Sequence, residues 1–158
     1  MRSGGEATLR RVAAGLALLG LGIATYITIA DAGGGSPVCV AGGHGCQTVA
    51  QSSYAHLAGI SVSVLGIGGY ALLLAAALAR GDAARFAALL LALAGFGFSA
   101  YLTYLELFVI DAVCQWCVAS AVVMTALLVV NAIRALRFSG SELAGAGLPR
   151  GASAEGEQ

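Results

Sequence analysis

Residues 112–133 read AVCQWCVASAVVMTALLVVNAI and contain no charged side chain. The run lies between Asp111 and Arg134 and consists mostly of Ala, Val and Leu. About 20 apolar residues in a helix are needed to cross a hydrocarbon core about 30 Å thick. The run therefore predicts a transmembrane helix, and two cysteines lie near its start.

Three further charge-free runs have a similar length and composition, and they cover residues 12–30, 57–79 and 86–105. Together with residues 112–133 they predict an all-α integral membrane protein, a four-transmembrane-helix bundle. Residues 32–56 are uncharged as well, but they contain the series Gly33-Gly34-Gly35-Ser36-Pro37, which is typical of a loop. The fold class thus includes a sizeable loop after the first helix.

The composition of the 158-residue chain agrees with this fold class. Hydrophobic residues make up 59% of the chain and charged residues 10%, and the mean hydropathy is +0.89. A soluble domain has about 25% charged residues, and a disordered chain has low hydrophobicity and high charge. The net charge is zero and the basic residues form no single dense face, so nucleic acid is not an expected partner.

The basic residues predict the orientation in the membrane. They fall before the first run, between the second and third runs, and after the fourth: Arg2, Arg10, Arg11, Arg80, Arg85, Arg134, Arg137 and Arg150. The charged residues of the other two loops are all acidic: Asp31, Glu106 and Asp111. The positive-inside rule then places both termini in the cytoplasm of a multi-pass protein of the plasma membrane, with the loop after helix one outside.

The two ends of the chain are interpreted separately. Arg10-Arg11, the following apolar run and the small residues around Asp31 also resemble a secretory signal. We favour a retained helix, because the run exceeds the ~7–15 apolar residues of a signal core. Residues 1–137 are expected to form one membrane domain, and residues 138–158, rich in Gly, Ala, Ser and Glu, a flexible cytoplasmic tail.

Four cysteines are expected on the outer face, where disulfides form and persist. Cys39 and Cys46 lie in the first loop, and Cys114 and Cys117 form a CxxC at the start of the fourth helix. The positive end of a helix dipole favours a thiolate there. Three glycines between Cys39 and Cys46 indicate a mobile segment, which suits a shuttling pair better than a structural staple. Two dithiol couples facing each other are therefore expected.

Other interpretations of these residues remain open. Two structural disulfides on the outer loops would make the protein a membrane scaffold without enzymatic activity. Cys39, Cys46, His44 and His56 would together supply the ligands of a Cys2His2 zinc site. The single residue between His44 and Cys46 is an awkward spacing for tetrahedral geometry, so we expect no metal.

Two stretches resemble the bacterial branch of the vitamin K epoxide reductase family. The first is residues 46–66, CQTVAQSSYAHLAGISVSVLG, and the second is Cys114-Gln115-Trp116-Cys117-Val118-Ala119-Ser120. The resemblance covers about residues 13–133. Disulfide-bond formation protein B is also a four-helix quinone reductase with two cysteine pairs, but its CxxC lies in the first loop. The order of the pairs here favours the vitamin K epoxide reductase family.

The resemblance implies a role for each cysteine. Cys39 and Cys46 match the family's shuttle pair, and Cys114 and Cys117 match its active-site pair beside the quinone. Ser52 matches a serine that hydrogen-bonds a quinone oxygen or a thiolate, so Ser52 and Cys117 are the candidates for quinone contact. A helix N-cap or a local turn is the alternative role of Ser52.

The implied activity is that of a thiol:quinone oxidoreductase that drives disulfide formation. Electrons would come from a separate exported thioredoxin-fold protein, because no thioredoxin-like domain follows Arg137. The quinone is expected to be of the menaquinone or ubiquinone type, since residue 121 is Ala where eukaryotic members carry Tyr and the second run contains no Asn. Tyr26, Tyr101 and Tyr104 are expected to form an aromatic belt at the interface rather than to contact the quinone.

Overall fold

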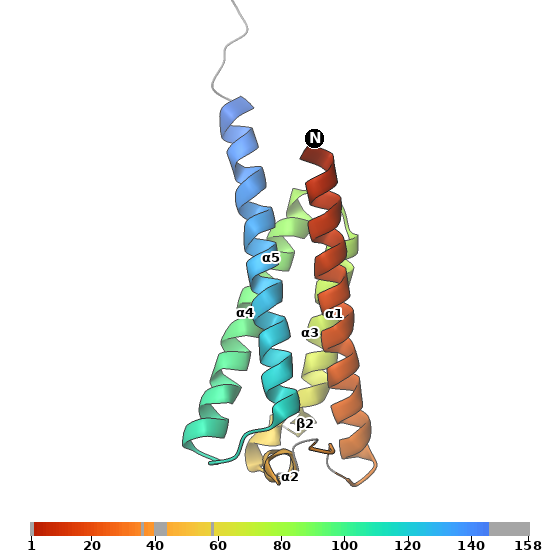
Figure 1. The fold of residues 1–158 in the computed structure, drawn as a ribbon, viewed down its shortest axis with the longest axis vertical. Coiled ribbons are helices and arrows are strands. Elements are labelled where there is room, and N and C mark those ends of the chain that lie inside the picture. The colour runs from red at the N-terminus through yellow and green to blue at the C-terminus, as the bar shows by residue number, and fades with distance from the viewer. Residues whose placement is uncertain (1, 36, 40–43, 58, 146–158) are drawn as a thin grey trace, which may run out of the picture.

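The computed structural model describes residues 2–35, 37–39, 44–57 and 59–145. Four long helices run side by side along the long axis of the molecule (Figure 1): α1 (Arg2–Ala32), α3 (Val62–Leu78), α4 (Asp82–Phe108) and α5 (Gln115–Gly145). One end of the bundle is closed by short elements: α2 (Gly45–Ala50), η1 (Ser53–Ala55) and the strands β1 (His56–Leu57) and β2 (Ile60–Ser61). The strands form an antiparallel pair in which Leu57 lies opposite Ile60.

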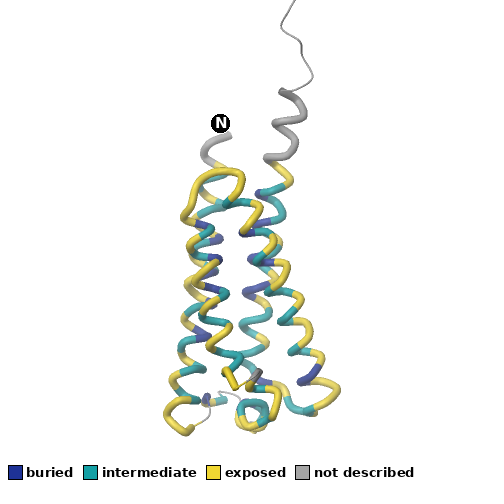
Figure 2. The backbone as a smooth tube through the Cα atoms, turned by 180° about the vertical axis from the view of Figure 1, so that it is seen from behind, coloured by how far each residue is buried: buried dark blue, intermediate teal, exposed yellow. Residues whose placement is uncertain are grey.

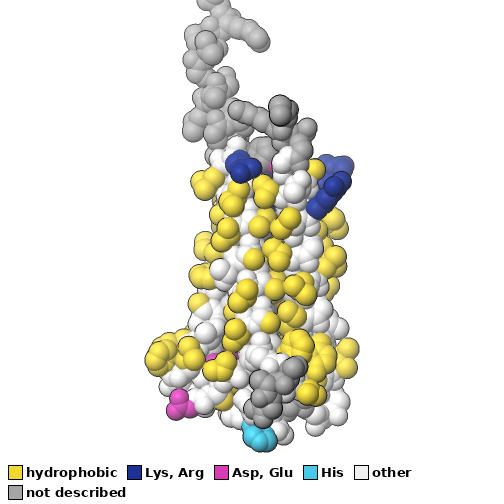
Figure 3. All heavy atoms as spheres, viewed as in Figure 1, with side chains coloured by type: hydrophobic (Ala, Val, Ile, Leu, Met, Phe, Trp, Pro, Cys, Tyr) yellow, Lys and Arg dark blue, Asp and Glu magenta, His cyan; other side chains and the backbone are white. Residues whose placement is uncertain are grey.

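The long helices are those of a membrane protein. Residues Gly5–Ala32, Asp82–Phe108 and Gln115–Arg137 are each long and apolar enough to cross a bilayer, and α3 is a shorter apolar helix of 17 residues. At most 28% of the most apolar window of each span is buried inside the protein. Apolar side chains cover the visible long face of the molecule, while arginines lie near the end that carries the N-terminus (Figure 3). Helices that are apolar on their outer faces are expected in lipid.

Small residues let the helices approach closely. The ring of Tyr70 on α3 fills the space beside Gly20 on α1, where a Cβ atom would overlap it. Met124 on α5 fills the corresponding space beside Gly95 on α4. The Tyr70 hydroxyl donates to the Ser120 carbonyl oxygen at 3.0 Å and thereby links α3 to α5. Buried positions recur along the inner faces of the helices (Figure 2), and close backbone contact supplies the packing that apolar lipid cannot drive.

An ion-pair cluster holds the end of the bundle that carries the N-terminus. Arg134 on α5 is only 2% exposed, and its Nη2 lies 3.7 Å from Oε1 of Glu6 on α1. The same Glu6 oxygen accepts from Nε of Arg85 on α4 at 3.2 Å. Arg134 also donates to Oδ1 of Asn131 at 3.1 Å. One carboxylate therefore joins three helices at this end.

The helix boundaries differ from the predicted ones for physical reasons. The second predicted helix starts too early, because residues 57–61 belong to a hairpin whose turn contains Gly59 at φ +83°. The third extends from the predicted 86–105 to 82–108, because a helix continues past the charges that end its apolar run. The predicted flexible tail also lies partly in a helix, since α5 runs through Gly145. Residues 146–158 lie outside the described residues.

Candidate active site

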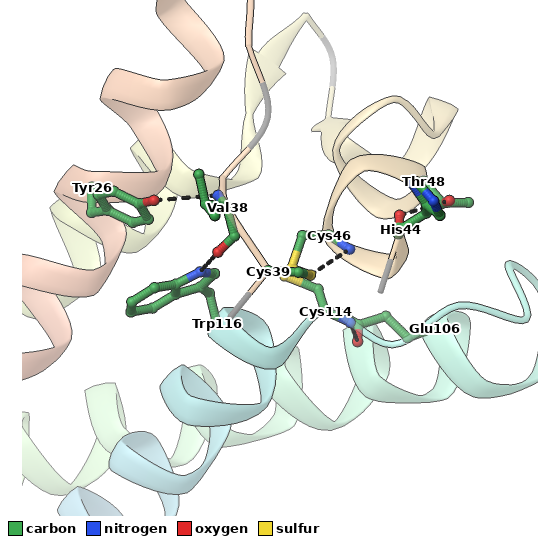
Figure 4. Close-up of a disulfide and its surroundings, with 9 residues drawn as sticks. All are labelled: Tyr26, Val38, Cys39, His44, Cys46, Thr48, Glu106, Cys114 and Trp116. Atoms are coloured by element: carbon green, nitrogen blue, oxygen red, sulfur yellow. Dashed lines mark hydrogen bonds between the residues drawn. A yellow bond between two sulfur atoms is a disulfide. The ribbon is translucent and has the colours of Figure 1, made fainter. Parts of the chain in front are cut away.

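Two cysteine pairs in different states lie at the end of the bundle opposite the N-terminus. Cys39 and Cys46 are joined in a disulfide, whereas Cys114 and Cys117 are free thiols. Cys46 and Cys114 are only 1% and 2% exposed, and Cys39 and Cys117 are half-buried. Cys46, Cys114 and Cys117 line one cavity. Figure 4 shows the disulfide directly beside Cys114.

The short helix α2 brings the loop pair to the start of α5. Gly45 precedes Cys46, and Val113 precedes Cys114. A Cβ atom at Gly45 would overlap the Val113 carbonyl oxygen and lie 3.1 Å from the carbonyl carbon, so the two backbones are in direct contact. Within the loop, the Cys46 N–H donates to the Cys39 Sγ at 3.2 Å. The absence of a side chain at Gly45 therefore sets how closely the two cysteine pairs approach.

Two aromatic residues hold the backbone next to Cys39. Nε1–H of Trp116 on α5 donates to the Val38 carbonyl oxygen at 3.0 Å, and the Val38 N–H donates to the Tyr26 hydroxyl on α1 at 3.3 Å. The two rings pack against each other with centroids 4.8 Å apart (Figure 4). Trp116 therefore fixes the segment that carries Cys39.

Cys114 occupies the N-cap position of α5. Its carbonyl oxygen accepts from the Val118 N–H at 3.0 Å, and Cys117 follows in the first turn of the helix. The pKa of Cys114 is lowered to about 7, first because the Cys117 thiol donates a hydrogen bond to it and further because the backbone N–H groups of Cys117 and Trp116 do so. Burial and the charge of Glu106 oppose this shift. Cys114 is therefore the thiol of this pair that ionises near neutral pH.

Glu106 is a buried carboxyl group in direct contact with the CxxC. It lies on the last turns of α4, is 4% exposed, and its Oε2 accepts from the Cys114 N–H at 3.1 Å. Its carboxyl group is also within hydrogen-bonding reach of the Cys117 side chain. The link from α4 to α5 folds back over this residue, since the Ala112 N–H donates to the Glu106 carbonyl oxygen. Asp111 in the link adopts φ +54°.

A cavity of about 210 Å³ extends from the cysteines between the helices. Its walls come from α1, α3, α4 and α5 and are mainly apolar, with Phe98 and Leu102 among them. Cys117 and Glu106 line it, as do the polar side chains of Ser52, Tyr70 and Ser120. An apolar space with a few polar groups in its lining suits a flat apolar molecule that carries polar oxygens.

The structure places the remaining predicted site residues as follows. Ser52 lines the cavity, and its hydroxyl donates to the Val49 carbonyl oxygen at 2.7 Å, which is the interaction of a local turn. Tyr101 and Tyr104 are exposed on α4, 49% and 56% respectively, and do not line the cavity. The aromatic belt stays a prediction. Residues 40–43, on which the expected mobility of the first loop depends, lie outside the described residues.

The two histidines of the zinc alternative lie in different surroundings. His56 Nε2 lies 3.9 Å from Oδ2 of Asp31, and His44 is exposed at the start of α2. Within the described part of the chain, no three His, Cys, Asp or Glu side chains gather as metal ligands would. Cys39 and Cys46, the other two members of the zinc alternative, are bonded to each other.

The sequence analysis did not select Glu106 or Gly45 as site residues. Glu106 was used only to mark the end of an apolar run and as an acidic residue of the loop that follows it. The run resumes directly after it with Leu107-Phe108-Val109-Ile110, so Glu106 is a single charge within an apolar stretch. An ionisable residue in such a stretch is itself a sign of function. The contact of Gly45 with Val113 has no counterpart in the sequence pattern.

Fold and site together define a membrane helix bundle with a disulfide and a dithiol against one cavity, which is the arrangement of a membrane thiol oxidoreductase. The model of the vitamin K epoxide reductase family matches residues 11–132. The chain belongs to this family. A search of curated proteins found no match.

Proposed function

We propose that this protein is a thiol:quinone oxidoreductase that drives disulfide formation in exported proteins. Electrons enter at Cys39 and Cys46 from a thioredoxin-fold partner, pass to Cys114 and Cys117, and leave to a membrane quinone. The single observation that carries the proposal is that residues of a disulfide and of a free dithiol line the same apolar cavity. Family membership supports the same class of chemistry.

The exposure of the four sulfurs gives the relay a direction. Cys46 and Cys114 are both buried, so exchange between them takes place away from water and from other thiols. Cys39 is half-buried, on a segment held from one side by Trp116. A thiolate on the partner therefore attacks Cys39 and releases Cys46 as a thiolate. The partner's second thiol then resolves the mixed disulfide and leaves the partner oxidised.

The second exchange moves the electrons into the membrane pair. The Cys46 thiolate attacks Cys114 of a Cys114–Cys117 disulfide, and Cys117 leaves. Cys39 then attacks Cys46, which restores the Cys39–Cys46 disulfide and leaves Cys114 and Cys117 reduced. This product has the distribution found in the structure, one disulfide and two free thiols. When Cys39 attacks Cys46, Cys114 is the thiolate that leaves, and its lowered pKa of about 7 makes it a good leaving group.

The cavity beside Cys117 fits the final acceptor. A quinone accepts two electrons and two protons, and that is the chemistry it supplies when bound. The apolar walls of the cavity, which include Phe98 and Leu102, would hold its ring. The Ser52 hydroxyl, which donates to the Val49 carbonyl oxygen in the structure, would have to turn away from it to donate to a quinone oxygen. The return of Cys114 and Cys117 to a disulfide releases the two electrons. We infer a quinone of the menaquinone or ubiquinone type from the absence of the eukaryotic Tyr at Ala121.

The proposed orientation follows from the two ends of the bundle. The cluster of Arg85 and Arg134 around Glu6 lies at the end that carries the N-terminus, and the cysteines lie at the other end. The positive-inside rule then places the cysteines on the extracytoplasmic face of the plasma membrane. Disulfides persist on that side, where a thioredoxin-fold partner would meet Cys39.

The test uses the purified protein in lipid with a reduced thioredoxin-fold protein and a soluble quinone. Quinone absorbance and mixed disulfides on non-reducing gels are followed for the wild type and for Cys39→Ala and Cys114→Ala. The expected result is quinone reduction by the wild type and none by either variant. Disulfides that do not exchange with dithiols, with no loss of quinone, would support a stapled scaffold instead.

A further inference from the structure

We propose that Glu106 is the proton acceptor of the Cys117 thiol and passes that proton on when the CxxC reduces its quinone substrate. The proposal rests on the function proposed above and assigns a residue to its last step. Glu106 is placed for this role because it contacts both members of the CxxC and lines the cavity beside them.

The position of Glu106 is unusual for a charged residue in this chain. It is 4% exposed and is the single charged residue from residue 86 to residue 110. A carboxyl group in such a place is expensive and is expected to serve a function. Its charge has no cationic partner among the ion pairs found in the described residues, whereas Glu6 and Asp82 both pair with arginine. The groups that satisfy Glu106 are those of the CxxC itself.

The chemistry of the last step needs a proton acceptor at this point. Two thiols and a quinone become one disulfide and a quinol, so two electrons and two protons are transferred. Cys114, with a pKa of about 7, is already ionised in much of the protein at neutral pH. The Cys117 thiol donates to the Cys114 sulfur and is also within hydrogen-bonding reach of the Glu106 carboxyl group. Glu106 is the acceptor in reach.

The step then balances with residues and substrate only. Glu106 accepts the Cys117 proton, and the Cys114 thiolate bonds to the Cys117 sulfur as the electron pair of Cys117 leaves to the quinone. The proton on Glu106 goes to one quinone oxygen, and a proton from water, equal to the one that Cys114 released, goes to the other. Glu106 returns to its carboxylate form, and the quinol leaves with two electrons and two protons.

Glu106 accepts a hydrogen bond from the Cys114 N–H and, in the proposal, a proton from Cys117. A glutamine at this position keeps the first role and loses the second. The amide oxygen of Glu106→Gln still accepts from the Cys114 N–H, so the link between α4 and α5 keeps its hydrogen bond. The amide accepts no proton at neutral pH. Asp111→Asn is the matched control, because Asp111 is an exposed carboxylate in the same link and asparagine tolerates its positive φ.

The two variants are compared in the quinone-reduction assay over a range of pH. Loss of a general acid–base group lowers a rate by about 100-fold or more, so Glu106→Gln should slow the quinone step by about 100-fold. The transfer from Cys46 to Cys114 needs no proton acceptor at Glu106, and its rate should change far less than the quinone step does. Asp111→Asn should change neither rate. Formate, a small carboxylate, should partly restore quinone reduction in Glu106→Ala.

A second measurement follows the ionisation of Cys114, which should become easier in Glu106→Gln while quinone reduction becomes slower. In protein lacking Cys39 and Cys46, thiolate absorbance in the ultraviolet follows the ionisation of Cys114. The charge of Glu106 raises the pKa of Cys114, so Glu106→Gln should ionise Cys114 at a lower pH than the wild type does. More thiolate together with slower quinone reduction is the signature of a lost proton acceptor. The two proteins carry the same other titratable groups in the cavity lining, namely Asp31, Tyr54, Tyr70 and Cys117.

The outcomes distinguish the two proposals. Quinone reduction by the wild type and by Glu106→Gln at equal rates would overturn the role of Glu106 and leave the oxidoreductase in place. A slow quinone step that formate does not restore, with Cys114 ionising as in the wild type, would make Glu106 a structural residue and also overturn the proposal. A wild type that reduces no quinone would overturn both.

Discussion

The contact between Gly45 and Val113 should control the rate of exchange between the two cysteine pairs. We therefore consider Gly45→Ala. The new Cβ atom would overlap the Val113 carbonyl oxygen and lie 3.1 Å from its carbonyl carbon and 3.4 Å from the Val113 nitrogen. These are backbone atoms at the start of α5 and cannot rotate away as a side chain would. The helix α2 must therefore move away from α5, and Cys46 moves with it.

The magnitude follows from the geometry. Misplacing reacting groups by roughly 1 Å can lower a rate by about 100-fold, and overpacking costs about 1–3 kcal/mol of stability. Alanine is intrinsically favoured over glycine in a helix by about 1 kcal/mol, so backbone preference would act in the opposite direction. A large loss of transfer rate with a small loss of stability would therefore come from the contact itself.

The assay separates entry of electrons from their transfer. Fully oxidised protein is mixed with a reduced thioredoxin-fold protein, quenched with an alkylating reagent, and analysed for labelled cysteines. In Gly45→Ala, Cys39 and Cys46 should be labelled at the wild-type rate, and Cys114 and Cys117 about 100-fold later. Gly68→Ala is the control, because a Cβ there meets nothing within 4 Å. Equal transfer in Gly45→Ala and wild type would refute the reasoning that this contact positions Cys46.

Three other changes test the site and its support. In protein lacking Cys39 and Cys46, Cys114 should be half ionised near pH 7 and lose its thiolate as the pH falls below that value; Cys117→Ala removes the donor that lowers this pKa, so ultraviolet titration should move to higher pH. Trp116→Phe keeps a ring beside Tyr26 but loses the hydrogen bond to Val38, and thermal unfolding should show a loss of about 1 kcal/mol. Glu6→Gln leaves buried Arg134 without its carboxylate and should lower the free energy of unfolding by about 3 kcal/mol in chemical unfolding. Asp82→Asn, at a side chain that is 77% exposed, should lower it by less than about 1 kcal/mol. Equal losses would contradict the ion-pair argument.

The helices could be located from the sequence because charge and length act together in a membrane protein. Each of the four runs without charge overlaps a long helix of the described residues, as expected where a buried charge in lipid is costly. The same rule set the boundaries wrongly. Charges mark where the apolar run ends, but hydrogen bonding continues a helix into the interface, as α4 shows by extending to Phe108. Residues 57–61 were misassigned because their hairpin is as apolar as the helix that follows.

The site was only partly accessible from the sequence. The cysteine spacing indicated two pairs, because close cysteines in one segment pair readily and the four lie at one face. The partners that position and tune them come from elsewhere in the chain, and no spacing rule connects them. Trp116 contacts Val38, and Glu106 contacts Cys114, only because α1, α4 and α5 end at the same level. Ser52 was selected by resemblance, and its hydroxyl is engaged with Val49.

The position of the CxxC at a helix start explains how one motif can serve two partners. Cys114 caps α5 and lies against the loop pair, whereas Cys117 lies three residues further along the helix axis, about 4.5 Å deeper at 1.5 Å per residue. In the proposed relay, one sulfur therefore meets the incoming disulfide while the other reaches the apolar cavity. The two sulfurs also differ in proton chemistry, because Cys114 has the N–H groups of the helix start and Cys117 has Glu106. In the proposed relay, the two sulfurs of one helix therefore have different partners, and electrons move from Cys114 toward Cys117 and the cavity. The carboxyl group of Glu106 lies beside Cys117, where a proton must follow the electrons.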